Sequence, residues 1–235
     1  MLGFGQSLQQ NKASGLIPVI PDIKLISPKE GNLFQDINPI NTAILMERLG
    51  APAISVVTEQ KYFGGSMKLL EDVTSAVSVP VLRKDFIIDE NDLYRTKECG
   101  ATAILLICGC LSAARLKKLY DAAMCLSLEP LIEVHTQAEL TLASSLGAKL
   151  IGINNRDILT LEKDDGSVSR TQELAMFMPK DAFFISESGI TTPEQAKAAI
   201  QAGAGAVLVG TAIWKSRNIC KFYQAMCRGE SEKND

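Results

Sequence analysis

Charged side chains stand at the ends of several apolar runs in this chain, at positions where a buried strand would ordinarily carry apolar residues. Two of the runs end in a lysine, Lys24 and Lys84, and two others end in a carboxylate, Glu133 and Glu187. A lysine held close to carboxylates can donate a proton while a carboxylate accepts one, because each charge shifts the pKa of its neighbours. These residues therefore predict acid–base chemistry, provided that the fold brings the four runs together.

A repeated pattern indicates which elements carry these residues. A glycine–alanine pair precedes an apolar run at four places: Gly50-Ala51, Gly100-Ala101, Gly147-Ala148 and Gly203-Ala204. Glycine suits the left-handed position that ends a helix, and an apolar run without alternation suits a strand buried on both faces of a parallel sheet. Further strands are predicted between these, at residues 17–24, 79–86, 129–134 and 182–186.

Helical patterns separate the predicted strands, for example at residues 66–77, 112–125 and 192–202. Strands that alternate with helices, without a break in composition, predict an α/β fold with a closed (β/α)8 TIM barrel rather than an open sheet. The 235 residues fit a single barrel domain over 1–235, since such barrels typically take about 250 residues. We expect a short N-terminal segment at 1–16 and a frayed tail at 228–235.

Barrel enzymes carry their chemistry where the strands end, at the C-terminal face of the barrel. The predicted strand ends carry these polar residues: Asp22, Lys24, Lys84, Glu133, Asn154, Arg156 and Glu187. A single ion pair across a barrel mouth is often only structural. Several ionisable groups that converge on one rim favour a catalytic site, because burying them without use or pairing is costly.

Glycines in the last two strand-end loops indicate a phosphate site. Ser188-Gly189 follows the seventh predicted strand, and Gly210-Thr211 follows the eighth. Backbone N–H groups at a glycine turn and at a helix start bind anions, and these two loops are a frequent phosphate site in barrels. Glycines that merely permit tight turns are the alternative interpretation, but the two loops together favour phosphate binding.

Two other features are better explained without function. His135, the only histidine, lies two positions after Glu133 and could be a base, but we favour a capping or surface histidine beside Thr136. The six cysteines contain no Cys-x-x-Cys pair, so free thiols in a reducing cytoplasm are expected. The pair Cys108 and Cys110 could be redox-active or bind a metal, yet no second pair supports this, and we predict no metal.

Composition and charge exclude several classes of partner. The chain has 24 basic and 27 acidic residues, whereas a nucleic-acid-binding surface requires a basic excess. No apolar run reaches the roughly 18 residues of a membrane span. Residues 1–15 lack the apolar stretch of a signal peptide. We therefore expect a cytoplasmic protein that binds neither nucleic acid nor membranes.

At these residues the chain resembles the indole-3-glycerol phosphate synthase family of tryptophan biosynthesis. The matching stretches occur in family order from about residue 17 to residue 216, and together they are highly specific. They are Ile23-Lys24 with Ser27-Pro28, residues 55–59 and 61–66, residues 80–87, 131–135, 151–157 and 186–190, and Val207-Leu208-Val209-Gly210.

The resemblance implies a carbon–carbon lyase that uses no metal or organic cofactor. Its substrate would be a sugar phosphate, 1-(2-carboxyphenylamino)-1-deoxyribulose 5-phosphate, which closes to an indole with loss of carbon dioxide and water. By position, Lys84 would be the general acid at the ketone oxygen, and Lys24 would hold the substrate carboxylate. Glu133 would be the base of the dehydration and would stabilise positive charge on the ring nitrogen.

The remaining matched residues would bind or orient the substrate. Asn154 would position its hydroxyls with support from Glu187, and Arg156 would stabilise the rim. The other residues implied in catalysis or binding are Asp22, Ser27, Phe86, Ser188, Gly189, Gly210 and Thr211. The resemblance also raises a possible association with other enzymes of the tryptophan pathway.

Three departures from the family pattern keep alternatives open. Asp22 replaces a glutamate, Leu25 replaces an arginine, and the N-terminal extension is shortened. A diverged relative that acts on another phosphorylated substrate is one alternative, and a non-catalytic barrel that binds a phosphorylated ligand is another. Lys84 and Glu133 argue against the second. Phosphoribosylanthranilate isomerase, which uses a cysteine base at its first strand, is set aside because this strand ends in Lys24.

Overall fold

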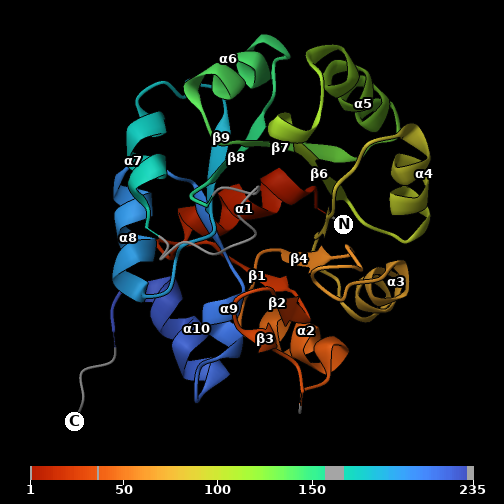
Figure 1. The fold of residues 1–235 in the computed structure, drawn as a ribbon. Coiled ribbons are helices and arrows are strands. Elements are labelled where there is room, and N and C mark those ends of the chain that lie inside the picture. Colours follow the sequence, from red (N-terminus) through yellow and green to blue (C-terminus); the bar gives the residue numbers. More distant parts are fainter. Residues whose placement is uncertain (1, 36, 157–166, 232–235) are drawn as a thin grey trace.

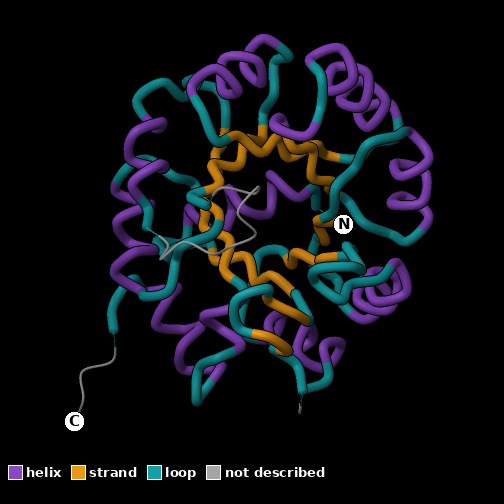
Figure 2. The backbone as a smooth tube through the Cα atoms, in the orientation of Figure 1, coloured by secondary structure: helices purple, strands orange, loops and turns teal. Residues whose placement is uncertain are grey.

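Eight parallel strands close into a barrel in the computed structural model, which describes residues 2–35, 37–156 and 167–231. Each strand pairs with the next along the chain, and the last pairs with the first. Figures 1 and 2 show the ring of strands with the helices around it. The predicted (β/α)8 TIM barrel is therefore confirmed. The strands are β1 (Val19–Ile23), β4 (Ile54–Val57), β5 (Val81–Lys84), β6 (Ala103–Ile107), β7 (Glu129–Val134), β8 (Leu150–Asn154), β9 (Phe183–Glu187) and β10 (Ala206–Val209).

The helices that cover the barrel begin and end at the signals present in the sequence. Thr192 and Gln195 form a capping box at the start of α8. Each repeated glycine before a strand, at 50, 100, 147 and 203, has a positive φ, which confirms its helix-ending role. The outer helices are α2 (Pro39–Arg48), α3 (Met67–Ala76), α4 (Glu90–Glu98), α5 (Ala113–Cys125), α6 (Gln137–Ser145), α7 (Ser169–Ala175), α8 (Pro193–Gln201), α9 (Thr211–Trp214) and α10 (Ile219–Arg228), with a 3-10 turn, η1, at Cys108–Cys110.

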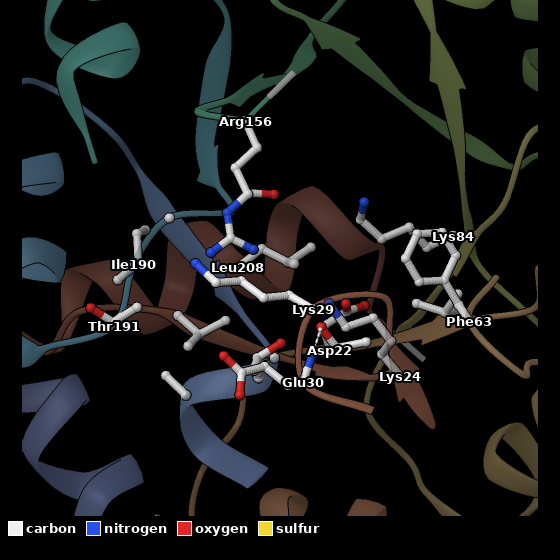
Figure 3. A pocket seen from close by; sticks show the side chains of 18 of the residues that line it. Asp22, Lys24, Lys29, Glu30, Phe63, Lys84, Arg156, Ile190, Thr191 and Leu208 are labelled. Carbon is white, nitrogen blue, oxygen red and sulfur yellow. Dashed lines mark hydrogen bonds between the residues drawn. The ribbon is translucent and has the colours of Figure 1, made fainter. Parts of the chain in front are cut away.

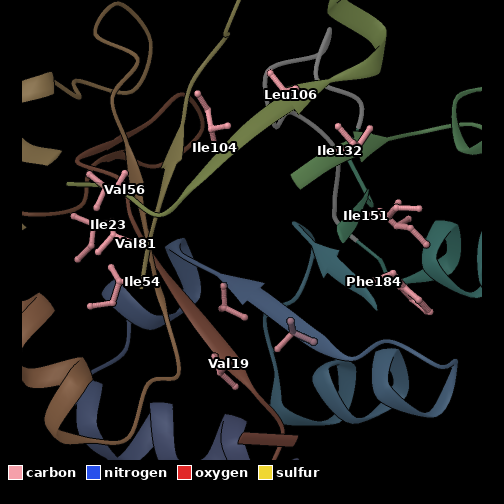
Figure 4. Close-up of a cluster of buried hydrophobic side chains, with 14 of the residues drawn as sticks. Val19, Ile23, Ile54, Val56, Val81, Ile104, Leu106, Ile132, Ile151 and Phe184 are labelled. Carbon is pink, nitrogen blue, oxygen red and sulfur yellow. The ribbon is translucent and has the colours of Figure 1, made fainter. Parts of the chain in front are cut away.

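Alternate residues of each strand face opposite sides of the barrel wall. Residues such as Val19, Ile132 and Phe184 face outward and pack in one cluster with the helices, and Figure 4 shows these side chains with others of the cluster around the barrel. Residues such as Leu82 and Leu131 belong to a second cluster inside the barrel. The inward positions near the strand starts are thus mostly apolar, and the next inward positions carry the polar residues of the site.

An N-terminal helix, α1 (Phe4–Ala13), was not predicted from the sequence. Phe4 and Leu8 are fully buried in the interior cluster. The backbone N–H groups of Phe4 and Gly5 donate to the Glu129 carboxylate at the start of β7. The helix therefore closes the N-terminal end of the barrel, opposite the predicted site, and Figure 1 shows it within the ring of strands.

Two short segments complete the described structure. A two-stranded antiparallel hairpin, β2 (Ile26–Ser27) with β3 (Gly31–Asn32), lies outside the barrel sheet and follows β1. At the C-terminus, Arg228 still belongs to α10, and Ser231 donates to Glu194. The last four residues of the predicted tail lie outside the described residues. No helix in the described part of the chain is long and apolar enough to cross a membrane.

Candidate active site

A cavity of about 570 Å³ opens at the C-terminal ends of the strands. Six basic and four acidic side chains line it, so its local charge is positive although the whole chain is acidic. Of the predicted site residues, the following line it: Asp22, Lys24, Ser27, Lys84, Phe86, Asn154, Arg156, Ser188, Gly189, Gly210 and Thr211. The structure therefore brings the sequence-predicted residues into one mouth.

Lys84 lies between the two remaining predicted residues, Glu133 and Glu187. Its Nζ is 3.6 Å from Glu133 Oε2 and 3.7 Å from Glu187 Oε2. Both carboxylates are fully buried, whereas the lysine side chain is 16% exposed and reaches the cavity. No hydrogen bond to either carboxylate is formed within the described residues. The three side chains meet because each occupies an inward position at the end of its strand.

One ammonium cannot balance two buried carboxylates, so a proton is retained in the cluster. The pKa of Glu187 is raised to about 8, mainly by burial, with the charges of Glu133 and Asp22 acting in the same direction and Lys84 opposing them. Room for this carboxylate comes from Gly152 on β8, where a Cβ would lie 1.9 Å from Glu187 Oε1. The cluster is thus a proton-holding site at the floor of the cavity.

Asp22 and Lys24 occupy successive inward positions at the end of β1. Asp22 Oδ1 accepts a hydrogen bond of 2.6 Å from Ser55 Oγ, and a Cβ on Gly210 would lie 3.3 Å from Asp22 Oδ2. Lys24 Nζ lies 5.7 Å from the centroid of the Phe63 ring, within reach of a cation–π contact. The pair therefore places a carboxylate beside the glycine loop and a cation beside an aromatic wall.

The residues on either side of Lys84, Arg83 and Asp85, belong to an ion-pair network that supports the fold. Arg83 is buried outside the barrel wall, where it forms ion pairs with Asp85 at 3.0 Å and Asp92 at 3.1 Å. It also donates to Thr58 Oγ1. This network fixes the β5–α4 loop and the end of β4, and so it holds the backbone of Lys84 in place.

A cationic subsite lies at the other end of the cavity. Figure 3 shows the heads of Arg156 and Lys29 in the same part of the cavity, near Ile190 and Thr191. Ser188 and Gly189, which join this wall to β9, both have left-handed backbone conformations, with φ of 61° and 70°. A cation pair beside a glycine loop suits an anion. Arg156, predicted at the rim, lies in the cavity wall itself.

Asn155 fixes the loop that carries this subsite. Its Nδ2 donates to Ser186 Oγ and to the carbonyls of Glu187 and Ser188 at 3.0–3.1 Å. Its Oδ1 accepts a hydrogen bond from the backbone N–H of Thr171. The neighbouring Asn154 faces the cavity instead, because adjacent strand residues point to opposite faces.

Several cavity residues were not predicted from the sequence. Among them are Lys29, Glu30, Phe63 and Lys215. Lys215 forms an ion pair with Glu30, which ties the loop between β2 and β3 to the segment after α9. Lys29 directly follows Ser27-Pro28 in the loop after the first strand, so its basic character at a strand-end loop was the signal that could have identified it.

The expectation for His135 was wrong. Thr136, not His135, caps α6, and the imidazole is only 10% exposed. Its Nε2 lies 3.5 Å from Glu133 Oε1, and its Nδ1 lies 3.5 Å from Glu139 Oε2. Residues two apart along an extended segment lie on the same face, so the spacing already pointed to a position beside Glu133, although the strand itself ends at Val134.

The cysteines agree with the prediction of free thiols. All six are unpaired. Burial raises the pKa of the Cys108 thiol to about 12, with smaller contributions from the charges of Glu139 and Glu133. Burial likewise raises the pKa of Cys110. A thiol in this state is a poor nucleophile at neutral pH.

Comparisons with known proteins agree with the site. The family model described as "Indole-3-glycerol phosphate synthase" matches residues 1–226. The chain is 42% identical over 230 residues to the "Indole-3-glycerol phosphate synthase" of Pyrococcus furiosus, a match that covers 98% of this chain and 100% of the relative. It is 40% identical over 203 residues to the protein of the same name from Streptococcus mutans, covering 86% of this chain and 78% of that one.

A solved structure shares the fold. It is the N-acetylmannosamine-6-phosphate 2-epimerase from Clostridium perfringens, with a TM-score of 0.67, 17% sequence identity, and coverage of 83% of this chain and 86% of that chain. At that identity the likeness concerns the barrel alone. The family model and the two relatives, by contrast, span most of the chain, and they show that it belongs to the indole-3-glycerol phosphate synthase family.

Proposed function

We propose that this protein closes 1-(2-carboxyphenylamino)-1-deoxyribulose 5-phosphate to indole-3-glycerol phosphate, with loss of carbon dioxide and water. The observation that carries the proposal is the position of Lys84, whose ammonium reaches the cavity while two buried carboxylates lie 3.6 and 3.7 Å from it. This arrangement supplies a proton donor and a proton acceptor at one point. We assign the protein accordingly as a carbon–carbon lyase of tryptophan biosynthesis in the cytoplasm.

Ring closure needs an activated ketone and a bent substrate. Lys84 donates its proton to the ketone oxygen as the ring carbon attacks, because a ketone is a poor electrophile until a cation reaches its oxygen. Lys24 holds the carboxylate of the aromatic ring, and Phe63, 5.7 Å from its Nζ, offers a face for that ring. The anchored ends bring the reacting carbons together, which reduces the entropic part of the barrier.

Dehydration then uses the carboxylate side of the cluster. The loss of carbon dioxide restores the aromatic ring. The hydroxyl then leaves as water with a second proton from Lys84, which regains it from solvent through the open cavity, while Glu133 stabilises the positive charge that develops and accepts the proton that completes the indole. Asn154 orients the substrate hydroxyls, and Glu187, which holds its own proton near neutral pH, supports this network. Only interactions that strengthen in the transition state contribute to the rate.

The phosphate occupies the cationic subsite in this proposal. Arg156 and Lys29 supply positive charge, and the loops at Ser188-Gly189 and Gly210-Thr211 supply backbone N–H groups. Ser27 and Phe86 line the same cavity and complete its walls. Association with other enzymes of the pathway stays a prediction.

The decisive experiment incubates the purified protein with the proposed substrate and follows the appearance of indole fluorescence. We expect saturable turnover in the native protein and none above background in Lys84→Met, because only the native cluster can protonate the ketone. A well-folded native protein that forms no indole would exclude the proposed reaction and would favour a diverged relative with another phosphorylated substrate.

A further inference from the structure

His135 connects the proposed base to the surface of the barrel. Glu133 is fully buried, the His135 side chain is 10% exposed, and the Glu139 side chain is 22% exposed. The two distances between neighbouring groups, Glu133 Oε1 to Nε2 and Nδ1 to Glu139 Oε2, are both 3.5 Å. Three side chains from the end of β7 and the first turn of α6 therefore form a row behind the cavity.

Both ends of the imidazole face carboxylates. Glu139 is fixed in place because its Oε2 accepts a hydrogen bond of 2.6 Å from the backbone N–H of His135. Its Oε1 packs against Gly109 of η1, where a Cβ would lie 3.5 Å away. Neither Nε2 of His135 nor the Glu133 carboxylate has a hydrogen-bond partner within the described residues. A buried donor and a buried acceptor thus face one another just beyond bonding distance.

A base needs a fixed orientation as well as a suitable charge. Lys84 approaches Glu133 at Oε2, and His135 approaches it at Oε1, so each carboxylate oxygen has its own neighbour. Without a donor at Oε1, the buried carboxylate is free to rotate about its last bond, and the oxygen that serves the substrate is no longer defined. A donor at Oε1 also stabilises the ionised form, which is the form able to accept a proton.

We propose that His135 is a positioning residue with an N–H on each ring nitrogen: Nδ1–H faces Glu139, which orients the ring, and Nε2–H holds Oε1 of Glu133, which leaves Oε2 as the basic atom next to Lys84. This inference rests on the proposed function. The groups that face the row are Glu133 and Glu187 with Lys84 on the cavity side, Glu139 on α6, and the thiols of Cys108 and Cys110 on η1.

Two substitutions of equal polarity separate positioning from packing. The amide nitrogen of a glutamine reaches the place of Nε2, so His135→Gln retains a donor toward Glu133. The amide of an asparagine reaches only the place of Nδ1, so His135→Asn does not. We expect His135→Gln to keep kcat within about 3-fold of the native value and His135→Asn to lower it about 10-fold or more, with KM little changed in both.

A third variant tests the role of Glu139. Glutamine serves as a cap at the same helix position in α8, where Gln195 Oε1 accepts from the backbone N–H of Thr191 and Thr192. Glu139→Gln therefore removes the charge and retains an acceptor for the helix start. We expect a lower kcat and an acidic limb of the kcat–pH profile that moves to higher pH. Glu90→Gln, an exposed change in the first turn of α4, is the control and should alter neither.

Because His135 is the only histidine, its ring gives one pair of nitrogen resonances in ¹⁵N-labelled protein. We expect a proton on both ring nitrogens, a changed Nε2 resonance in Glu133→Gln and a changed Nδ1 resonance in Glu139→Gln. An Nε2 resonance that does not respond to Glu133→Gln would overturn the proposal even if the native protein forms no indole. Equal kcat values and pH profiles for His135→Gln and His135→Asn in an active native protein would overturn it as well. Failure of the proposed function alone would instead show as a native protein without turnover.

Discussion

Strand β7 carries two inward-facing glutamates that differ in their partners and in their position along the barrel. Glu129, at the start of the strand, accepts hydrogen bonds from the backbone N–H groups of Phe4 and Gly5 at the beginning of α1. Glu133, four residues further and at the other end of the barrel, accepts none from the described residues and faces Lys84 and His135 instead. One carboxylate is satisfied by a helix start, and the other is held among groups that can exchange protons.

The difference shows how one strand can stabilise the fold and carry the chemistry. A carboxylate at a helix N-terminus has donors and a favourable dipole, so it lowers the free energy of the folded state. A buried carboxylate without donors raises that free energy unless its partners compensate. Residue type and strand parity are the same at both positions, and only the surroundings assign the role.

The largest expected effect comes from removing the proton-transfer groups. Glu133→Gln and Lys84→Met should each lower kcat about 1,000-fold, since positioned acid–base groups contribute roughly 100- to 10,000-fold. Stability should fall little or even rise in Glu133→Gln, because a buried charge is removed. Steady-state kinetics and urea unfolding measure the two quantities. Full activity in Lys84→Met would contradict the assignment of the acid.

The next effect concerns Glu187 and depends on pH. Its pKa is raised to about 8 in the folded protein, from an ordinary value of 4.5, so the folded state holds a proton that the unfolded state has lost. The stability of the native protein should therefore fall between pH 4.5 and 8, whereas Glu187→Gln lacks this dependence. The variant should gain on the order of 3 kcal/mol relative to the native protein across that window.

Urea unfolding of the native protein and of Glu187→Gln at pH 5 and pH 8 measures this difference in unfolding free energy. The opposite sign, a variant that becomes relatively less stable as pH rises, would mean that Glu187 is ionised and that its ion pair with Lys84 dominates.

A smaller effect is expected from Glu129→Gln, the counterpart of Glu133→Gln on the same strand. The amide retains one acceptor oxygen, so one backbone N–H at the start of α1 loses its partner, at a cost of about 1–2 kcal/mol. The kcat should stay unchanged because the other end of the barrel is not involved. Urea unfolding measures the loss of stability, and the indole assay measures kcat. A clear loss of activity would show that the two ends of β7 are coupled.

The smallest effect is expected from Asp22→Glu. The longer side chain restores the family residue and carries its carboxylate further into the cavity, away from Ser55 Oγ, which donates to Asp22 now. Activity should stay within about 3-fold or rise, since Lys84 and Glu133 are untouched. The assay is kcat/KM on the proposed substrate. A loss of kcat/KM of about 10-fold or more would instead show that the reaction requires the shorter carboxylate of Asp22.

The sequence predicted the barrel and most of the cavity because strand parity and strand-end position are visible in it. Lys84, Glu133 and Glu187 meet as expected from those two rules. Helix α1 was missed because only Phe4, Gly5 and Leu8 of its ten residues are buried, which leaves no clear apolar stripe.

The position of His135 was missed for a different reason. Strand parity places it on the face of Glu133, but the cap at Thr136 ends the extended segment directly after His135, and that helix boundary favoured a surface position. Lys29 was missed because the hairpin of β2 and β3, which carries it over the cavity, has strands of only two residues each.

Gly152 couples two positions on neighbouring strands, because it leaves the space that the Glu187 carboxylate occupies. Because a Cβ there would meet Glu187 Oε1 at 1.9 Å, any larger residue at 152 must displace the carboxylate. Replacing Glu187 first by a small residue would leave a void in a closely packed interior. The two sites should therefore show a strong, non-additive interaction in a double-mutant cycle. A mutational path away from this chemistry crosses a destabilised intermediate, which tends to keep the lineage of this barrel on its present reaction.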